Sequence, residues 1–348
     1  MPFFCGKCLG TIGETQGVFM RYLWMISILI PLNIGAQTIT TSGLSAGAYM
    51  AQQFQMAHSG SVSGVAVLAG GPFFCARNQL IDAMNRCMNT VMGLPKKEDS
   101  IAEARRAAIA GEIDSLENMK HARVLVLAGT EDKTVHPDVG GVLVDTYRDL
   151  GIEPSALRFV NTLKIGHAFP TESFGNPCPT PSQPPYISAC GRDMAGEILT
   201  HLHGTLNPKK AVRAESFKRY EQLSAVELDE EKANISLGKY GYAYIPAGCE
   251  NGNCSIHVAF HGCKQSIDDV QQSYIKETGL NAWAEGNRII ILYPQVVKSF
   301  VPNNPNACWD WWGYTGAKYH TKNGAQMKVV MKNVEDLKSG RMNFLPMN

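Results

Sequence analysis

The pentapeptide Gly43-Leu44-Ser45-Ala46-Gly47 contains the residue types of a serine nucleophile. It lies between a Thr-rich, strand-like run over 37–42 and an apolar-periodic helix that begins at Ala46 and stops at His58-Ser59-Gly60. Glycines on both sides of a serine permit the strained strand-to-helix turn that presents a hydroxyl to a substrate. The pattern therefore predicts a nucleophilic Ser45. The alternative is a glycine-rich turn whose serine merely caps the helix.

A serine nucleophile needs a base that takes its proton and an acid that orients the base. The apolar run 124–128 leads into Gly129-Thr130-Glu131-Asp132, which places Asp132 at the C-terminal end of a strand, where open α/β sheets carry their sites. The next run, 157–160, leads to His167. The chain order serine, acid, histidine is that of α/β-hydrolases, so we expect Ser45, Asp132 and His167 to act together.

Other side chains of the same types remain alternatives. A solvated loop carboxylate or imidazole is the ordinary reading of any single one of them. Chain order and strand context favour Asp132 and His167. The rival acids are Glu131 and Asp138, and the rival bases are His136, His201, His203 and His261.

Acyl transfer also requires two donors aimed at the developing oxyanion. The backbone N–H of Ala46, directly after the nucleophile, is one candidate. The other donor normally follows a His-Gly strand end that precedes the nucleophile, but here His261-Gly262-Cys263 follows the run 256–260, far downstream. If the Cys263 amide is the second donor, the fold is circularly permuted; the alternative is an ordinary tight turn.

Composition and periodicity indicate an α/β fold. The 348 residues are 45% hydrophobic and 18% charged, enough to bury a sizeable core. Lys and Arg total 32 against 31 Asp and Glu, without long runs of one sign, so we expect no nucleic-acid or membrane-surface partner. Strand-like and helix-like segments alternate, which predicts a mostly parallel sheet with helices on both faces. The strand-like runs are 65–69, 124–128, 157–160, 242–245, 256–260 and 289–293; the helical patterns are 101–110, 139–150, 194–202 and 327–337.

The domain organisation is expected to be simple. The polar stretch 205–239 is the only plausible boundary between two domains, and it lacks a Ser/Gly- or Pro-rich linker. We therefore expect a single domain over 37–348, with 177–185 as a surface loop tethered by cysteines.

The first 36 residues resemble a leader. Met20-Arg21 gives a basic start, 23–32 an apolar stretch, and Ile34-Gly35-Ala36 a small-residue cleavage site. The apolar stretch is shorter than the ~20 residues that span a bilayer. We expect export and cleavage near Ala36, with Met20 as the true start; a retained anchor or a buried helix is the alternative. The pair Cys5 and Cys8 has no partner pair that would complete a metal site.

Eight cysteines follow the leader, an even count that argues for disulfides in an exported protein. Eight cysteines allow 105 connectivities, so the pairing stays open. Free thiols in a cytoplasmic protein are the alternative. Sequence proximity suggests Cys75–Cys87, Cys178–Cys190 and Cys249–Cys254, which leaves Cys263–Cys308.

At the level of motifs the chain resembles the poly(3-hydroxybutyrate) depolymerase family, in particular its circularly permuted catalytic domain. The resemblance covers about 38–338 and rests on several separate stretches, so it is far more specific than the serine motif alone. These stretches are Gly43-Leu44-Ser45-Ala46-Gly47-Ala48-Tyr49-Met50, Gly129-Thr130-Glu131-Asp132, Gly166-His167, Pro170-Thr171, His261-Gly262-Cys263-Lys264-Gln265, Leu292-Tyr293-Pro294-Gln295 and Cys308-Trp309-Asp310-Trp311-Trp312-Gly313-Tyr314.

The resemblance implies a secreted, cofactor-independent serine esterase without a metal. It implies Ser45 as nucleophile, Asp132 as acid, His167 as base, and the amides of Ala46 and Cys263 as oxyanion donors. It also implies the Cys263–Cys308 disulfide and favours Trp309 as the substrate-facing member of an aromatic group that includes Trp311, Trp312 and Tyr314. The implied substrate is a hydroxyalkanoate polymer or its oligomers. Family members that attack crystalline polymer often carry a linker and a separate polymer-binding domain, and we expect 37–348 to be a single catalytic domain without either. Feruloyl or acetyl esters, or a non-catalytic binding role on the same scaffold, are the alternatives.

Overall fold

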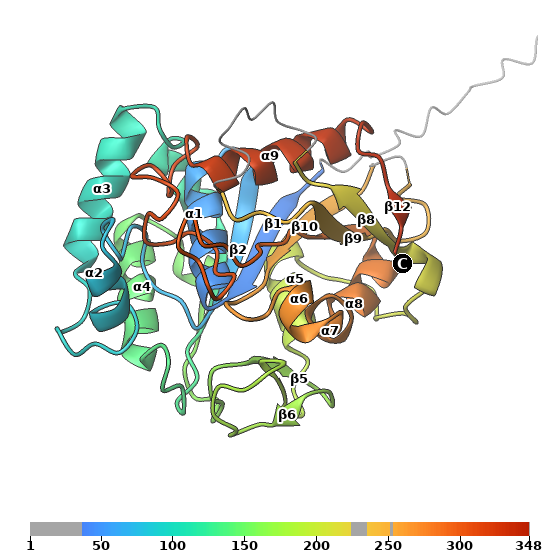
Figure 1. Cartoon of the computed structure of the whole chain (residues 1–348), viewed down its shortest axis with the longest axis horizontal. Helices are drawn as coiled ribbons and strands as arrows, with labels where there is room; N and C mark the ends of the chain where they lie inside the picture. Colours follow the sequence, from blue (N-terminus) through green and yellow to red (C-terminus); the bar gives the residue numbers. More distant parts are fainter. Residues whose placement is uncertain (1–36, 224–234, 251–252, 348) are drawn as a thin grey trace, which may run out of the picture. The chain divides into compact units, whose positions relative to one another are not determined.

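A nine-stranded sheet runs through the described part of the chain (Figure 1). The computed structural model describes residues 37–223, 235–250 and 253–347. The strand order is β12-β8-β9-β11-β10-β1-β2-β3-β4, and the six strands from β11 to β4 pair in parallel, whereas β11, β9, β8 and β12 pair antiparallel. The strands are β1 Ile39–Leu44, β2 Val62–Leu68, β3 Arg123–Leu127, β4 Leu157–Val160, β8 Phe217–Glu221, β9 Tyr240–Tyr244, β10 Ser255–Phe260, β11 Ile289–Tyr293 and β12 Leu345–Pro346.

Helices cover both faces of the sheet (Figure 1). Side chains alternate along each strand, so Val65 and Val67 belong to one buried cluster and Ala66 and Leu68 to the other. The first cluster also contains residues of α1 Ala46–Ala57, α3 Lys97–Ile109, α4 Pro137–Asp149 and α9 Ala325–Lys338. The second contains residues of α5 Met194–His203, α7 Ser273–Glu277 and α8 Leu280–Asn287. The mostly parallel α/β fold predicted from the sequence is confirmed.

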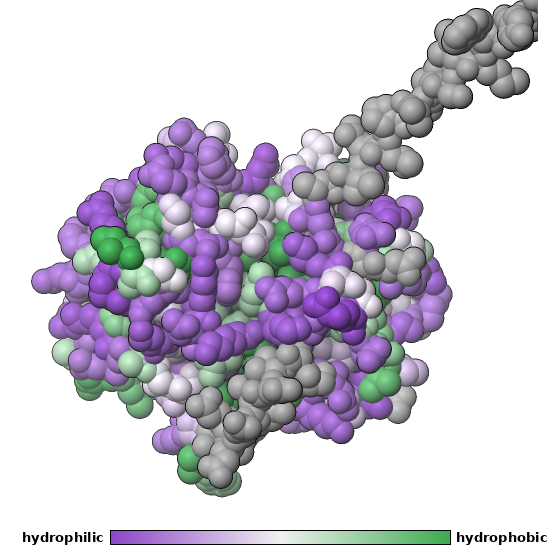
Figure 2. Space-filling model, turned by 90° about the horizontal axis from the view of Figure 1, so that it is seen from above, coloured by the Kyte–Doolittle hydropathy of each residue, from purple (hydrophilic) through white to green (hydrophobic). Residues whose placement is uncertain are grey.

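Helix α9 illustrates why these segments are helices. Its buried residues Met327, Val330, Val334 and Leu337 recur at helical spacing and form one apolar stripe. On the side where Figure 1 draws α9, the surface is mostly hydrophilic, with hydrophobic residues in small groups only (Figure 2). No helix among residues 37–223, 235–250 and 253–347 has the length and apolar character that crossing a bilayer requires.

The register of β1 fixes where the functional loops meet. Strand β1 pairs with β10 on one side, Gly43 opposite Phe260, and with β2 on the other. Because β1, β3 and β10 run parallel, their carboxyl ends lie at one edge of the sheet. The segments leaving these ends carry Ser45, Asp132 and the turn that begins at His261, so the topology brings together parts of the chain that are far apart in sequence.

Some elements differ from the sequence-based expectations. The stretch 205–239, in which the sequence predicts no regular element, contains strand β8 and the short 3-10 helix Ala214–Ser216, and β8 joins the main sheet. The Pro-rich segment lies beside a small sheet of β5 Phe169–Thr171, β6 Asn176–Pro177 and β7 Ile187–Ala189. Short helices α2 Leu80–Asn85 and α6 Ile267–Val270 were not anticipated. The expected leader over 1–36, with Cys5 and Cys8, lies outside the described residues.

Four disulfides join the described cysteines. They are Cys75–Cys87, Cys178–Cys190, Cys249–Cys254 and Cys263–Cys308, the pairs that sequence proximity suggested. The last links segments 45 residues apart and attaches the turn after β10 to the tryptophan-rich segment.

Gly47 permits the close contact between α1 and the end of β10. A Cβ added there would lie 2.3 Å from the carbonyl oxygen of Phe260 and 2.4 Å from that of His261, distances that backbone atoms cannot relieve without moving. We expect Gly47→Ala to destabilise the protein by about 3–5 kcal/mol. It should also lower kcat, because the clash displaces the turn that follows β10, and this turn lies in the site.

Gly141→Ala is the matched control, since an added Cβ at this position in α4 meets nothing within 4 Å. This variant should gain about 0.5–1 kcal/mol. Urea unfolding together with ester turnover measures both effects, and equal stabilities of the two variants would contradict the steric argument.

Candidate active site

Ser45 occupies a strained turn between β1 and α1. Its φ is 58°, in the left-handed region that non-glycine residues rarely adopt, and its amide donates to the carbonyl of Leu68 (2.9 Å). The side chain makes no capping hydrogen bond with α1, so the structure does not support the capping alternative. Gly43 allows the turn to close, because a Cβ there would lie 2.2 Å from the carbonyl oxygen of Gly47. This geometry presents the serine hydroxyl at the edge of the sheet.

Asp132 and His167 form a buried pair in the loops after β3 and β4. The Nδ1 atom of His167 lies 2.8 Å from Oδ2 of Asp132. The other carboxylate oxygen accepts the backbone N–H groups of Thr134 (2.8 Å) and Val135 (2.9 Å), which fixes the carboxylate plane. Because the carboxylate holds the proton on Nδ1, the Nε2 lone pair of His167 is left to accept a proton.

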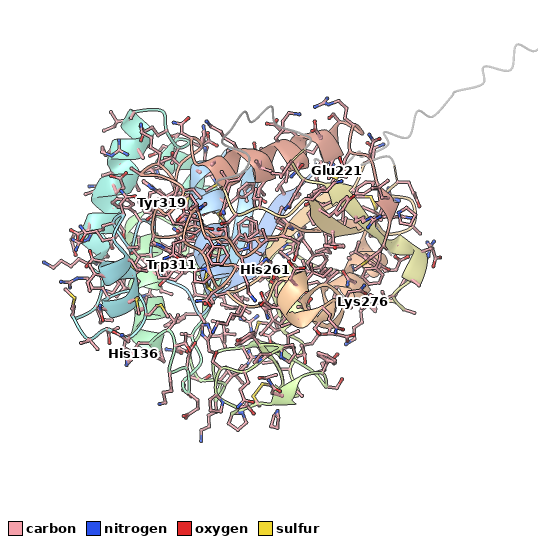
Figure 3. All side chains as sticks on the ribbon, viewed as in Figure 1. His136, Glu221, His261, Lys276, Trp311 and Tyr319 are labelled. Atoms are coloured by element: carbon pink, nitrogen blue, oxygen red, sulfur yellow. A yellow bond between two sulfur atoms is a disulfide. The ribbon has the colours of Figure 1, made fainter. Side chains whose placement is uncertain are left out.

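The rival acids and three of the four rival bases lie elsewhere. The fourth base, His261, belongs to the turn beside Ser45, but both of its ring nitrogens are engaged by backbone groups, the Gly262 carbonyl (2.7 Å) and the Val296 amide (3.2 Å). Glu131 and Asp138 are exposed, and Asp138 is 3.6 Å from the exposed His136. Figure 3 shows His136 at the margin of the molecule and His261 near its middle. His201 contacts the backbone carbonyls of Val124 and Ala156, and His203 the hydroxyl of Thr40. The structure brings neither these rivals nor His136 to Ser45.

The turn after β10 lies directly beside Ser45. A Cβ built on Gly262 would lie 3.5 Å from the Cβ of Ser45. The amide of Gly262 donates to the side chain of Gln265 (2.8 Å), whose own amide group donates to the carbonyls of Pro185 and Tyr186. Within the described residues, neither the Ala46 nor the Cys263 amide donates to a protein acceptor. Both donors are therefore available to an oxygen bound near Ser45.

A cavity of about 450 Å³ contains Ser45 and His167 in its wall, a volume typical of small-molecule sites. Its lining contains both apolar and polar residues. The apolar residues include Leu80, Ala83, Met84, Met88, Trp311 and Trp312, and the polar residues include Ser182, Tyr186, Lys264, Gln265, Asn303 and Asn306.

Trp309 does not line this cavity, which corrects the expectation that it contacts substrate. Its side chain is 0% exposed and packs edge-on against Phe260, with ring centroids 4.9 Å apart. Trp311 lines the cavity instead and stacks on Tyr49 of α1, with centroids 4.3 Å apart. Figure 3 shows Trp311 in the interior of the molecule, near the turn that carries His261.

Asp310 is a buried residue that sequence reasoning missed. Its Oδ1 accepts the amides of Gly313 (2.7 Å) and Tyr314 (3.1 Å), and its Oδ2 accepts both the amide and the hydroxyl of Thr315. Burial raises the pKa of this carboxyl group. Asp310 thus holds the turn that orients Trp311, and the only sequence signal was an aspartate followed by a glycine and a threonine at turn spacing.

Two fully buried histidines make stability depend on pH. Burial lowers the pKa of His261 to about 4 and places that of His257 well below its ordinary value. The unfolded chain therefore binds more protons than the folded protein between about pH 6.5 and pH 4, and stability must fall as pH falls through this window. Each histidine contributes a slope of about 1.4 kcal/mol per pH unit.

Urea unfolding at a series of pH values measures this slope. His257→Gln should flatten it, because an amide does not titrate. The exposed His136→Gln is the control and should reproduce the wild-type slope. A stability that stays constant from pH 7 to pH 5 would contradict the burial argument.

Together, the strained serine turn, the buried histidine–aspartate pair and the two adjacent amides on an α/β sheet define a serine hydrolase of the α/β-hydrolase type.

Comparisons with known proteins identify the family within this class of hydrolases. No protein-family model matches the chain. It is 37% identical over 315 residues to the poly(3-hydroxybutyrate) depolymerase of Delftia acidovorans, covering 89% of this chain and 61% of that protein. It is 34% identical over 345 residues to the polyhydroxybutyrate depolymerase of Talaromyces funiculosus, covering 92% and 98%. The chain belongs to the poly(3-hydroxybutyrate) depolymerase family.

Solved structures of PHB depolymerases also match this chain. The crystal structure of PHB depolymerase from Penicillium funiculosum superposes with a TM-score of 0.78 at 32% identity, covering 87% of this chain and 96% of that one. A serine-to-alanine variant of PHB depolymerase complexed with an R3HB trimer matches with the same TM-score at 33% identity and the same coverage. The chain spans 61% of the length of the Delftia protein.

Proposed function

We propose that the protein hydrolyses the ester bonds of poly(3-hydroxybutyrate) or its oligomers through an acyl-enzyme on Ser45. The observation that carries this proposal is the buried pair of His167 and Asp132, with Nδ1 and Oδ2 2.8 Å apart, in which His167 lines the same cavity as Ser45. The names of the two curated relatives and the R3HB trimer bound to a structural neighbour support the substrate class.

The reaction proceeds in two steps. The Ser45 hydroxyl attacks the ester carbonyl while Nε2 of His167 takes its proton, and Asp132 stabilises the imidazolium. His167 then protonates the departing alkoxy oxygen, which leaves as a hydroxyacid. Water, deprotonated by the same imidazole, releases the acyl group from Ser45 and regenerates the enzyme.

The oxyanion of each tetrahedral intermediate accepts hydrogen bonds from the amides of Ala46 and Cys263, each worth about 3–4 kcal/mol of barrier. This assignment makes the chain a circular permutant. Its support is that the strand carrying the nucleophile comes first along the described chain yet lies inside the sheet, beside β10, whose end provides the second amide.

We also propose export from the cytoplasm, to the periplasm or beyond. The four disulfides support an oxidising compartment, and the basic and apolar residues before Ala36 support a cleaved leader. Residues 37–348 then form the catalytic unit, and the apolar residues of the cavity accommodate the methyl branches of the repeat.

The decisive experiment measures release of soluble hydroxyacid from amorphous poly(3-hydroxybutyrate) and from its short oligomers, with feruloyl and acetyl esters in parallel. We expect 3-hydroxybutyrate and its oligomers from the wild-type protein. Turnover of only feruloyl or acetyl esters would reassign the substrate, and absence of all turnover in folded protein would favour a binding role.

A further inference from the structure

The cavity contains a single fixed charge. Among the described residues that line it, Lys264 is the only Lys, Arg, Asp or Glu. No carboxylate in the described part of the chain forms an ion pair with its ammonium group, in contrast to Lys298, which pairs with Asp269, and Lys318, which pairs with Glu112. Lys264 is exposed and lines the cavity together with Ser45 and His167. An anionic group of a ligand would therefore find one partner there and no competing acid.

The backbone of Lys264 is firmly held. Its amide donates to the carbonyl of Asn306 (2.7 Å), and the preceding Cys263 is linked to Cys308. The following Gln265 is 1% exposed and tied to three backbone groups. Since consecutive Cα atoms are about 3.8 Å apart, the backbone that carries this side chain is directly beside the proposed oxyanion donor at Cys263.

The chemistry of a hydroxyacid ester specifies which anion would approach Lys264. Every ester bond of such a chain has its acyl part on the side of the free hydroxyl end and its alkoxy part on the side of the free carboxylate end. When the last ester bond lies over Ser45, the leaving group is a single hydroxyacid that carries the carboxylate. A lysine side chain and one 3-hydroxyacid repeat have comparable lengths, so an ammonium anchored at the oxyanion turn reaches a carboxylate one repeat away.

We propose that Lys264 binds the terminal carboxylate of the leaving hydroxyacid and so favours cleavage of the last ester bond of short, carboxylate-terminated oligomers. This inference rests on the proposed function and specifies its substrate class. A solvent-accessible ion pair of this kind corresponds to a roughly fivefold preference. Salt should weaken the preference, because the pair is open to screening.

The test compares the 3-hydroxybutyrate trimer as the free acid with its methyl ester, and follows p-nitrophenyl butyrate in parallel. The readout is the ratio of kcat/KM for the acid to that for the methyl ester, in which any general effect of a substitution on the turn cancels. We expect a ratio of about five for the wild-type protein and for K264R, about one for K264Q, and below one for K264E. K338Q, which removes an exposed charge from the last turn of α9, should retain the wild-type ratio.

A wild-type ratio near one, or a ratio that K264E leaves unchanged, would overturn the carboxylate site while ester hydrolysis stands. If no ester is hydrolysed, the proposed function is wrong, and calorimetric binding to S45A then decides the site alone. Binding of 3-hydroxybutyrate in preference to methyl 3-hydroxybutyrate, lost in K264E, supports the site; equal affinity for the two compounds refutes it.

Discussion

Ser45→Ala is expected to lower kcat on soluble esters by about 10⁶-fold without unfolding the protein. The substitution removes the attacking oxygen but leaves the backbone turn, whose φ of 58° is held by the Leu68 carbonyl and by the two flanking glycines. The remaining turnover would come from the Ala46 and Cys263 amides and from substrate binding alone.

Steady-state hydrolysis of p-nitrophenyl butyrate and labelling by a fluorophosphonate measure this effect. The wild-type protein should be labelled and S45A should not. Ser63→Ala, which removes an exposed hydroxyl of β2, serves as the matched control and should behave like the wild type. If S45A kept its activity within tenfold, another nucleophile would have to be sought.

Asp132→Asn is expected to lower kcat by about 10⁴-fold. An asparagine oxygen still accepts the amides of Thr134 and Val135, so the loop should persist. Its NH₂ group, however, faces Nδ1 of His167 and favours the tautomer with the proton on Nε2, which cannot accept a proton from Ser45.

Kinetics and thermal unfolding separate this effect from loss of folding. The melting temperature should change little while kcat collapses. Asp138→Asn is the control, because that rival carboxylate is exposed and pairs only with the exposed His136. An Asp138→Asn variant that lost more activity than Asp132→Asn would reverse the assignment of the acid.

Residues that follow strands could be predicted from the sequence. The apolar, β-branched runs reveal buried parallel strands, and a polar residue directly after such a run must lie at the carboxyl edge. This reasoning placed Ser45, Asp132 and His167 in a single region before any contact was known. The turn at His261 was equally accessible, because its strand ends in the apolar residues Val258, Ala259 and Phe260.

Side chains positioned by turns could not be predicted in the same way. The direction of Trp309 and Trp311 depends on the backbone hydrogen bonds that the Asp310 carboxylate accepts, and no periodicity encodes these bonds. Helix α2 has only six residues and no side-chain cap, although Leu80 and Met84 form part of the cavity wall. Such short elements depend on tertiary contacts rather than on local propensity.

The location of β1 has a consequence for synthesis. Thr40 on β1 and its hydrogen-bonded partner His257 on β10 are 217 residues apart, so most of the chain must leave the ribosome before β1 acquires its second neighbour. Until then β1, which leads into Ser45, has a neighbouring strand on one side only. Bringing two segments so far apart in sequence into contact is slow, because the intervening chain loses conformational entropy. A nascent chain of this design completes its sheet only after β10 has been translated, and the proposed oxyanion turn, and with it hydrolytic competence, follows from that late step.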